Sequence, residues 1–289
     1  MAAFWFFNGF QYVLLMKKYR KSYQEIESLD KPFVACSATR IWEEVPSRYN
    51  PYLTDKCRCH GYDHMELMEK RGFADVLFLL LRGELPNSEQ SALLEALMVG
   101  LINPGPRHAA TRAAMNAGAG KTDPAHILPI GLSVLGGAHL GGAEVSEAMA
   151  FIRKHRRKDP RALAMGLLVE YEPPEVGDWR VAPGFGSRYG GIDPLPARLA
   201  DHLAGMIKQS DVLEWGTRFA EALATKKGGW LITSVAAAVF LELGFHPREG
   251  AGLFQIAAAP GLLAHGLELA NQPVTALPFV DDEHYFLEE

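Results

Sequence analysis

Four side chains that could bind a metal ion, Cys57, Cys59, His60 and His64, fall within a stretch of eight residues. Thiolate and imidazole groups are the protein ligands that Zn²⁺ prefers. A structural zinc site normally combines two such pairs from separate parts of a chain, and this sequence supplies only one. We therefore predict no metal centre and interpret these residues as packed or solvent-exposed thiols and imidazoles.

Gly118–Thr122, with the sequence Gly-Ala-Gly-Lys-Thr, is similar to the end of a phosphate-binding loop. That motif also needs a glycine where Met115 stands and a strand in front of it, whereas the preceding residues have a helical pattern. Glycines at this point are typical of a helix C-terminus, so nucleotide binding is not predicted. The sequence contains no Gly-x-Ser-x-Gly motif for a nucleophilic serine, and its ten histidines are scattered.

Two segments rich in glycine are better candidates for contacts with a ligand. Gly136–Gly142, Gly-Gly-Ala-His-Leu-Gly-Gly, is predicted to be a loop or helix junction whose backbone can approach a ligand. Residues 172–194 contain many prolines and glycines and are predicted to form a long exposed connection. Connections of this kind often carry binding residues.

The elements that position these segments are predicted to be helices. Asn87, with Gln90 three residues later, is typical of a helix start, and the alanine-rich residues 108–119 indicate an inner or interface helix. Further helical patterns cover residues 124–135, 144–156, 160–171, 196–209, 211–226, 229–243 and 247–269. Alternating strand patterns are scarce, so the sequence predicts an all-α fold.

The composition excludes several functional classes. With 289 residues, 48% apolar and 22% charged, the chain is predicted to be globular, and its net charge of −5 argues against broad nucleic-acid binding but leaves room for a local basic patch. Three cysteines cannot form a disulfide framework and favour a cytoplasmic location. Residues 2–16 are apolar, but they are short for a membrane span and their basic residues follow them. We predict an N-terminal extension over residues 1–30 and no membrane anchor.

Several colinear segments between about residues 60 and 265 resemble the citrate synthase superfamily, and its short citryl-CoA lyase branch most of all. They are the run Phe73–Pro86, the glycine-rich turn Leu135–Ala143, the loop Ala182–Arg188 followed by Asp193-Pro194 and Arg198, and the late helices around Ala236–Phe245 and Leu253–His265. The resemblance implies a two-domain, all-α fold with an active-site cleft between the domains. The large domain would take residues 31–143 and 229–289, and the small domain, 144–228, would carry a loop for coenzyme A.

The resemblance also implies a Claisen condensation or its reverse on a coenzyme A thioester, yet most of the groups that the family uses are replaced. The replacements are Leu140 and Ser187 for two catalytic histidines, Thr233 for the carboxylate base, Asn103 for a substrate-holding histidine, and Leu195 and Ala258 for two arginines. Loss of acid–base help costs about 10²–10⁴-fold in rate per group, and loss of a donor to an oxyanion costs about 3–4 kcal/mol. Ordinary citrate synthesis is therefore not expected.

Two hypotheses remain. The first is an enzyme with a non-standard site that cleaves or forms a citryl-CoA-type thioester, with an acyl-CoA and a small carboxylic or keto acid as ligands and no bound cofactor. Its catalytic candidates are His139, Ser187, Glu144 and Thr233; the coenzyme A loop is Pro183, Gly184, Phe185, Gly186 and Arg188; and Asn103 and Arg198 are the substrate-binding candidates. The second is a catalytically silent paralogue, either a ligand sensor or a subunit of a hetero-oligomer with an active relative. The resemblance implies a homodimer in the first case.

Overall fold

The computed structural model describes residues 38–172, 174, 179–278, 280–281 and 283–285. The chain divides into a first unit, Met1–Arg40, and a second unit, Ile41–Glu289, which contains every helix and strand described below. The predicted extension over residues 1–30 lies outside the described residues.

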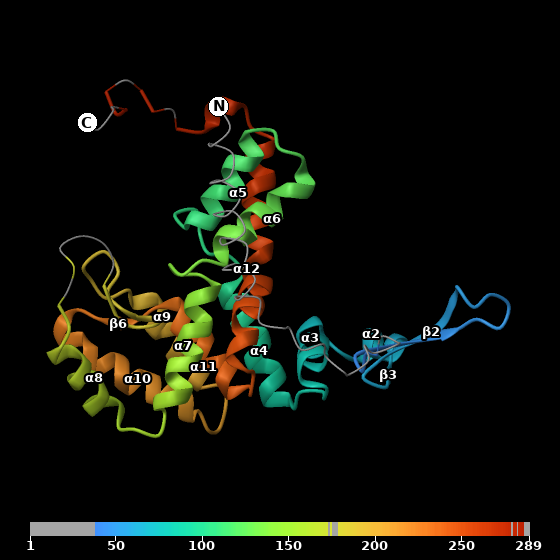
Figure 1. Cartoon of the computed structure of the whole chain (residues 1–289), viewed down its shortest axis with the longest axis horizontal. Helices are drawn as coiled ribbons and strands as arrows, with labels where there is room; N and C mark the ends of the chain where they lie inside the picture. The colour runs from blue at the N-terminus through green and yellow to red at the C-terminus, as the bar shows by residue number, and fades with distance from the viewer. Residues whose placement is uncertain (1–37, 173, 175–178, 279, 282, 286–289) are drawn as a thin grey trace, which may run out of the picture. The chain divides into compact units, whose positions relative to one another are not determined.

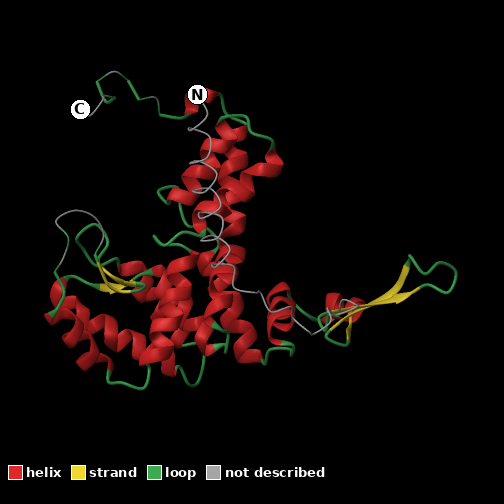
Figure 2. Cartoon of the chain, viewed as in Figure 1, coloured by secondary structure: helices red, strands yellow, loops and turns green. Residues whose placement is uncertain are grey.

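Helices dominate the second unit (Figure 2), so the predicted all-α class is confirmed. The α-helices are α2 (His64–Lys70), α3 (Phe73–Arg82), α4 (Ser88–Leu101), α5 (Ala109–Ala119), α6 (Pro124–Leu135), α7 (Gly142–His155), α8 (Pro160–Val169), α9 (Pro194–Ala204), α10 (Asp211–Leu223), α11 (Ile232–Glu242) and α12 (Pro247–Ala270). Two short 3₁₀ turns, η1 (Ala224–Lys226) and η2 (Val274–Ala276), complete the set. The helix start predicted at Asn87 is confirmed, because Asn87 and Gln90 form a capping box.

Two small antiparallel sheets accompany the helices. β1 (Trp42–Pro46), β2 (Thr54–Cys59) and β3 (Tyr62–Asp63) form the first, in that order, and Cys57 and Cys59 both lie on β2. β4 (Arg180–Ala182), β5 (Phe185–Gly186) and β6 (Gly229–Trp230) form the second. Within the described residues, no group of three His, Cys, Asp or Glu side chains is arranged to hold a metal ion.

α12 is the helix around which much of the core forms, and it runs beside α5 and α6 (Figure 1). By length and composition alone α12 could cross a membrane. It packs against α4, α5, α6, α7 and α11, so contacts with these helices account for its apolar composition. A Cβ atom added to Gly118 of α5 would lie 2.0 Å from the carbonyl oxygen of Gly266 on α12. The small residues of α5 therefore serve a close helix contact inside this chain.

The segment that resembles a phosphate-binding loop is the end of α5, as predicted. α5 ends at Ala119 with Gly120 as its C-cap, and Lys121 follows with a left-handed backbone. The Lys121 ammonium donates to the carbonyl oxygens of Ala270, the last residue of α12, and of Gln272, two residues later. Its charge is thus used to close the end of a neighbouring helix.

The glycines of Gly136–Gly142 bring protein backbones together. α6 ends at Leu135 and α7 begins at Gly142, so the junction predicted from the sequence is confirmed. A Cβ atom on Gly142 would lie 3.1 Å from Ala251 of α12, and one on Gly141 would lie 2.3 Å from the carbonyl oxygen of Gly137. Neither Gly141 nor Gly142 lines the cavities described below.

The prediction of a long exposed connection over residues 172–194 is wrong for residues 180–187. β4 and β5 form a hairpin there, β6 from the distant residues 229–230 pairs with β5, and Phe185 is completely buried. A Cβ atom on Gly186 would overlap the carbonyl oxygen of Trp179. The absence of a side chain at Gly186 lets β5 lie close to the backbone that enters β4, so this glycine serves a strand contact rather than a loop.

The predicted division into a large domain (31–143 and 229–289) and a small domain (144–228) stays a prediction. α8, α9 and α10 of the proposed small domain pack together, but α7, which it also includes, packs against α11 and α12.

Candidate ligand-binding site

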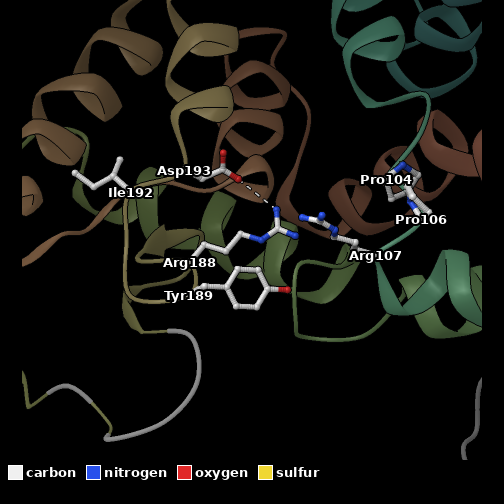
Figure 3. A pocket seen from close by; sticks show the side chains of 8 residues that line it. Pro104, Pro106, Arg107, Arg188, Tyr189, Ile192 and Asp193 are labelled. Atoms are coloured by element: carbon white, nitrogen blue, oxygen red, sulfur yellow. Dashed lines mark hydrogen bonds and ion pairs between the residues drawn. The ribbon is translucent and has the colours of Figure 1, made fainter.

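Two adjoining cavities lie where the loop between α4 and α5 meets the loop between β5 and α9. The outer cavity, of about 580 Å³, is lined by residues 104–107 and by Arg188, Tyr189, Ile192 and Asp193 (Figure 3). The inner cavity, of about 110 Å³, shares Pro104, Arg188 and Asp193 with it. The other lining residues of the inner cavity are Gly100, Leu101, Asn103, His108, Leu140, Leu195, Leu199, Ile232 and Phe254. A mostly apolar pocket with a few convergent polar groups is the usual form of a small-molecule site.

Arg188 is the cation shared by both cavities. Its Nη1 lies 3.2 Å from Oδ2 of Asp193, and its guanidinium carbon lies 5.5 Å from the centre of the Tyr189 ring. Its Nε is buried and has no hydrogen-bond partner among the described residues. Arg188 can therefore donate further hydrogen bonds to a bound anion.

Arg107 is a second cation at the outer cavity. Its guanidinium points toward that of Arg188 (Figure 3). Two guanidinium groups that face one cavity, with Asp193 as the carboxylate in the lining, leave a net positive charge there. Such a site favours carboxylate or phosphate groups, which arginine binds through paired hydrogen bonds.

His108 is a buried histidine held in one neutral form. It is the N-cap of α5, its Nδ1 accepts a hydrogen bond from the backbone N–H of Ala110, and its Nε2 lies 3.1 Å from the carbonyl oxygen of Leu140. Nδ1 must be unprotonated to accept a hydrogen bond, and Nε2 must be protonated to donate one. Both ring nitrogens therefore take part in hydrogen bonds that the neutral ring alone can make. Burial lowers the pKa of His108 from its ordinary 6.5, the hydrogen bond to Leu140 opposes this, and the nearby His139 and Arg188 lower it further. A neutral His108 thus positions the lining of the inner cavity.

We expect the protein to lose stability as the pH falls below about 6.5, in part through His108. The unfolded chain binds a proton at the ordinary pKa, whereas the folded chain binds it only at a lower pH, so acid favours unfolding. Asn is a good N-cap residue that does not titrate, and His108→Asn should make the free energy of unfolding less dependent on pH between 7.5 and about 5.5. Urea unfolding at several pH values measures this. An identical pH dependence in both proteins would contradict it.

Glu144 is the centre of a buried polar network beside the inner cavity. The side chain of Glu144 is 4% exposed, and its Oε1 accepts a hydrogen bond from Nε of Arg180 at 2.7 Å. Its Oε2 accepts from the hydroxyl of Thr233 and from the backbone N–H of Leu140, both at 3.0 Å. Nη2 of Arg180 lies 3.5 Å from Nδ1 of His139. The network therefore joins the turn before α7, strand β4 and the first turn of α11.

The structure brings together three of the four predicted catalytic residues. The hydroxyl of Thr233 donates directly to Glu144, and Arg180 links His139 to the same carboxylate, although none of the three lines either cavity. Ser187 is 1% exposed, and its hydroxyl has no partner among the described residues. The catalytic roles themselves stay predictions.

The predicted ligand-binding residues are divided between the cavities and other places. Asn103 lines the inner cavity and Arg188 lines both. Pro183, Gly184, Phe185 and Gly186 belong to the β4–β5 hairpin and line neither cavity, and Phe185 packs into the core. Arg198 is exposed on α9 and also lines neither cavity.

Sequence reasoning missed Arg107, His108 and Arg180. His108 precedes an alanine-rich helix, where a capping role was a possible signal. Arg107 lies in the loop between α4 and α5, where the sequence resemblance pointed only to Asn103 as a substrate-binding residue. Arg180 is 36 residues from Glu144, and nothing in the local pattern connects the two.

Known structures provide a comparison for this arrangement. No protein-family model and no curated protein matches the sequence. The citryl-CoA lyase of Hydrogenobacter thermophilus matches with a TM-score of 0.71 and 25% identity over 88% of this chain and 94% of that chain. An ATP citrate lyase of Methanosaeta concilii, solved with (3S)-citryl-CoA, matches with a TM-score of 0.66 and 16% identity over 88% of this chain and 43% of that chain. The citrate synthase of Thermotoga maritima matches with a TM-score of 0.55 and 19% identity over 75% of this chain and 58% of that chain.

The chain therefore has the helical fold of the citrate synthase superfamily, as the sequence resemblance implied. Within that superfamily it is similar to citryl-CoA lyase, which it matches over nearly the whole length of both chains.

Proposed function

We propose that this chain binds an acyl-CoA thioester whose acyl part carries a carboxylate, and that it acts on the bond between the α and β carbons of that acyl part in the manner of a citryl-CoA lyase. The observation that carries the proposal is the pair of arginines, Arg107 and Arg188, at adjoining cavities in a chain similar to citryl-CoA lyase. The carboxylate and the phosphates of such a ligand are the anions that this pair suits.

In this proposal the residues of the two cavities divide the work. Arg188, anchored by Asp193, binds and orients the acyl carboxylate, and the apolar wall formed by Leu199, Ile232 and Phe254 excludes water from the inner cavity. Asn103 offers an amide, held in place by the backbone N–H of Gly105 and by His265. Asp193 is the carboxylate within the lining, so it is the candidate to take a proton from the ligand.

We expect Arg188→Met to weaken the binding of a stable citryl-CoA analogue by about 10- to 100-fold, because it removes a charge-assisted and partly buried contact. Calorimetric titration of the full chain with coenzyme A, acetyl-CoA and the analogue measures this. The matched control is Arg218→Met, since Arg218 is exposed on α10 and pairs with Glu214 on the surface. No heat with any of the three ligands, from folded protein, would overturn the proposal.

The second candidate is a catalytically silent protein that binds the same ligand as a sensor or as a subunit beside an active relative. The position that the resemblance gives to the carboxylate base holds Thr233, and its hydroxyl is committed to Glu144. The oxygens of Glu144 are in turn occupied by three donors. A thioester-cleavage assay on the purified chain separates the two candidates: turnover supports the enzyme, and binding without turnover supports the silent protein. A homodimer and a cytoplasmic location stay predictions.

A further inference from the structure

A third cavity, of about 280 Å³, lies at the far end of α7 and α11 from the ligand-binding site. It is lined by Arg82, Arg153, Arg156 and His246 together with Leu241, Gly244 and Phe245. We call it the basic cavity. Ile232, at the start of α11, lines the inner cavity of the first site, and Leu241, near its end, lines the basic cavity. At 1.5 Å per residue the two lining positions are about 14 Å apart along the helix. The basic cavity is therefore a separate cavity from the two that form the ligand-binding site.

The basic residues of this cavity come from three different elements. Arg82 ends α3, Arg153 lies in the last turn of α7 with Arg156 as its C-cap, and His246 is the N-cap of α12. Basic residues in the last turn of a helix stabilise its dipole, which is sufficient reason for Arg153 and Arg156 to lie on α7. It does not explain why α3 and α12 bring further cationic or polar groups to the same cavity.

The arginines of the basic cavity have no carboxylate partner. In the described part of the chain, none of Arg82, Arg153 and Arg156 forms an ion pair. Arg82 donates to the carbonyl oxygen of Gly244 at 2.6 Å, which fixes its guanidinium at the rim. Three like charges that share one cavity repel one another, and a bound anion would relieve this.

The neighbouring carboxylates are occupied elsewhere. Oε1 of Glu242 accepts the backbone N–H groups of Val212 and Leu213 at the start of α10, at 2.7 and 3.2 Å. Oε2 of Glu249 accepts the backbone N–H of His246 in a capping box. Both carboxylates hold helix starts through these hydrogen bonds. The charge of Glu242 still attracts that of Arg156, and Arg82 and Arg153 leave an excess of positive charge at the cavity.

The surrounding sequence strengthens the positive charge. Residues 153–158 are Arg-Lys-His-Arg-Arg-Lys, five cationic side chains and one histidine in succession within a chain of net charge −5. Burial lowers the pKa of His155, and the charges of Lys158 and Lys154 lower it further. A concentrated positive field of this kind attracts anions from solution.

We propose that the basic cavity is a second ligand site, which binds the phosphate groups of a di- or triphosphate anion. Guanidinium groups bind phosphate through paired hydrogen bonds, and three of them on different elements suit an anion with several charged oxygens better than a single carboxylate. α7 carries Glu144 at one end and Arg153 at the other, and it packs against α11, which spans the same two places (Figure 1). The basic cavity is thus linked to the first site through two packed helices.

The test is calorimetric titration of the full chain with inorganic tripolyphosphate, ATP and coenzyme A at fixed ionic strength. We expect a saturable tripolyphosphate site that is weakened at least tenfold in the double variant Arg153→Met/Arg156→Met. Added salt should weaken it as well, because the contacts are exposed and ionic. The matched control is Arg112→Met/Arg218→Met, which removes two exposed arginines on α5 and α10. Comparison of tripolyphosphate with ATP shows whether a nucleoside adds to the affinity.

Two further variants keep the outcomes distinct. Arg153→Lys/Arg156→Lys retains both charges and should retain part of the affinity for tripolyphosphate. Circular dichroism of each variant shows whether it is folded, so a loss of binding is distinguished from a loss of folding. Arg188→Met removes a cation from the first site but should leave the tripolyphosphate site that depends on Arg153 and Arg156 unchanged, so this result does not depend on the function proposed for the first site. The proposal is overturned if tripolyphosphate does not bind to the wild type, if it binds equally well to Arg153→Met/Arg156→Met, or if its binding is lost in Arg188→Met.

Discussion

Glu144→Ala is expected to lower the free energy of unfolding by about 3–5 kcal/mol. The substitution removes one member of a buried ion pair and leaves the Arg180 guanidinium, whose side chain is 24% exposed, without its carboxylate. It also leaves the backbone N–H of Leu140 and the hydroxyl of Thr233 without the acceptor that they share. An unpartnered buried donor costs about 1–3 kcal/mol, and an unpaired charge costs more. The expected loss is therefore several times that of an ordinary surface substitution.

Urea unfolding followed by circular dichroism measures this loss. The matched control is Glu147→Ala, since Glu147 is exposed on the same helix and has no ion pair among the described residues. Glu144→Gln retains one acceptor but removes the charge, so it should give an intermediate loss. If Glu144→Ala is as stable as Glu147→Ala, the network does not hold the turn before α7.

The Glu144 network also bears on catalysis. In the hypothesis of an enzyme with a non-standard site, Glu144 is the possible base. In the folded chain that carboxylate faces Arg180, Thr233 and the backbone of Leu140, and it does not line either cavity. Asp193 does line both cavities, although the sequence resemblance named it only as part of the Asp193-Pro194 segment after the loop.

Much of the helical fold could be predicted because helices leave local signals. The patterns at residues 124–135 and 247–269 match α6 and α12 within one residue at each end. Prolines start both helices, Gly136 follows the end of α6 and Asn271 follows the end of α12, and these signals act within a few residues of sequence. β5 and β6 were missed because they pair residues that are 43 or 45 positions apart, as in Gly186 with Gly229 and Phe185 with Trp230. Such pairing leaves no periodic trace in segments of two residues.

The site could be predicted only in part, for a similar reason. Arg188 and Asn103 were found because the resemblance places ligand-binding groups in their segments. Arg180 was missed because its role depends on a hydrogen bond to a residue in a different element. His108 was missed because the resemblance assigns no function to that position. Phe185 was assigned to the coenzyme A loop from its motif, whereas its contacts belong to the core.

Phe185→Ala is the second substitution with a large expected effect, a loss of about 3–5 kcal/mol in the free energy of unfolding. Phe185 is 0% exposed, and its ring centre lies 4.8 Å from that of Phe219 and 4.9 Å from that of Trp230. Removal of the ring leaves a cavity between α10 and the β4–β5–β6 sheet and breaks both aromatic contacts. The same urea experiment measures the loss.

This substitution distinguishes the two interpretations of the Pro183–Arg188 loop. If Phe185 contacts coenzyme A, as the sequence resemblance implies, Phe185→Ala should weaken ligand binding while changing stability little. If Phe185 is a core residue, stability should fall and the binding measured on the remaining folded protein should change little, because Arg188 keeps its place at the cavities. Phe185→Leu, which fills most of the space, should recover much of the loss, and Phe73→Ala, at a position that is 72% exposed, should lose little. If Phe185→Ala lowers the affinity for the citryl-CoA analogue tenfold and leaves the free energy of unfolding unchanged, Phe185 contacts the ligand and its assignment to the core is wrong.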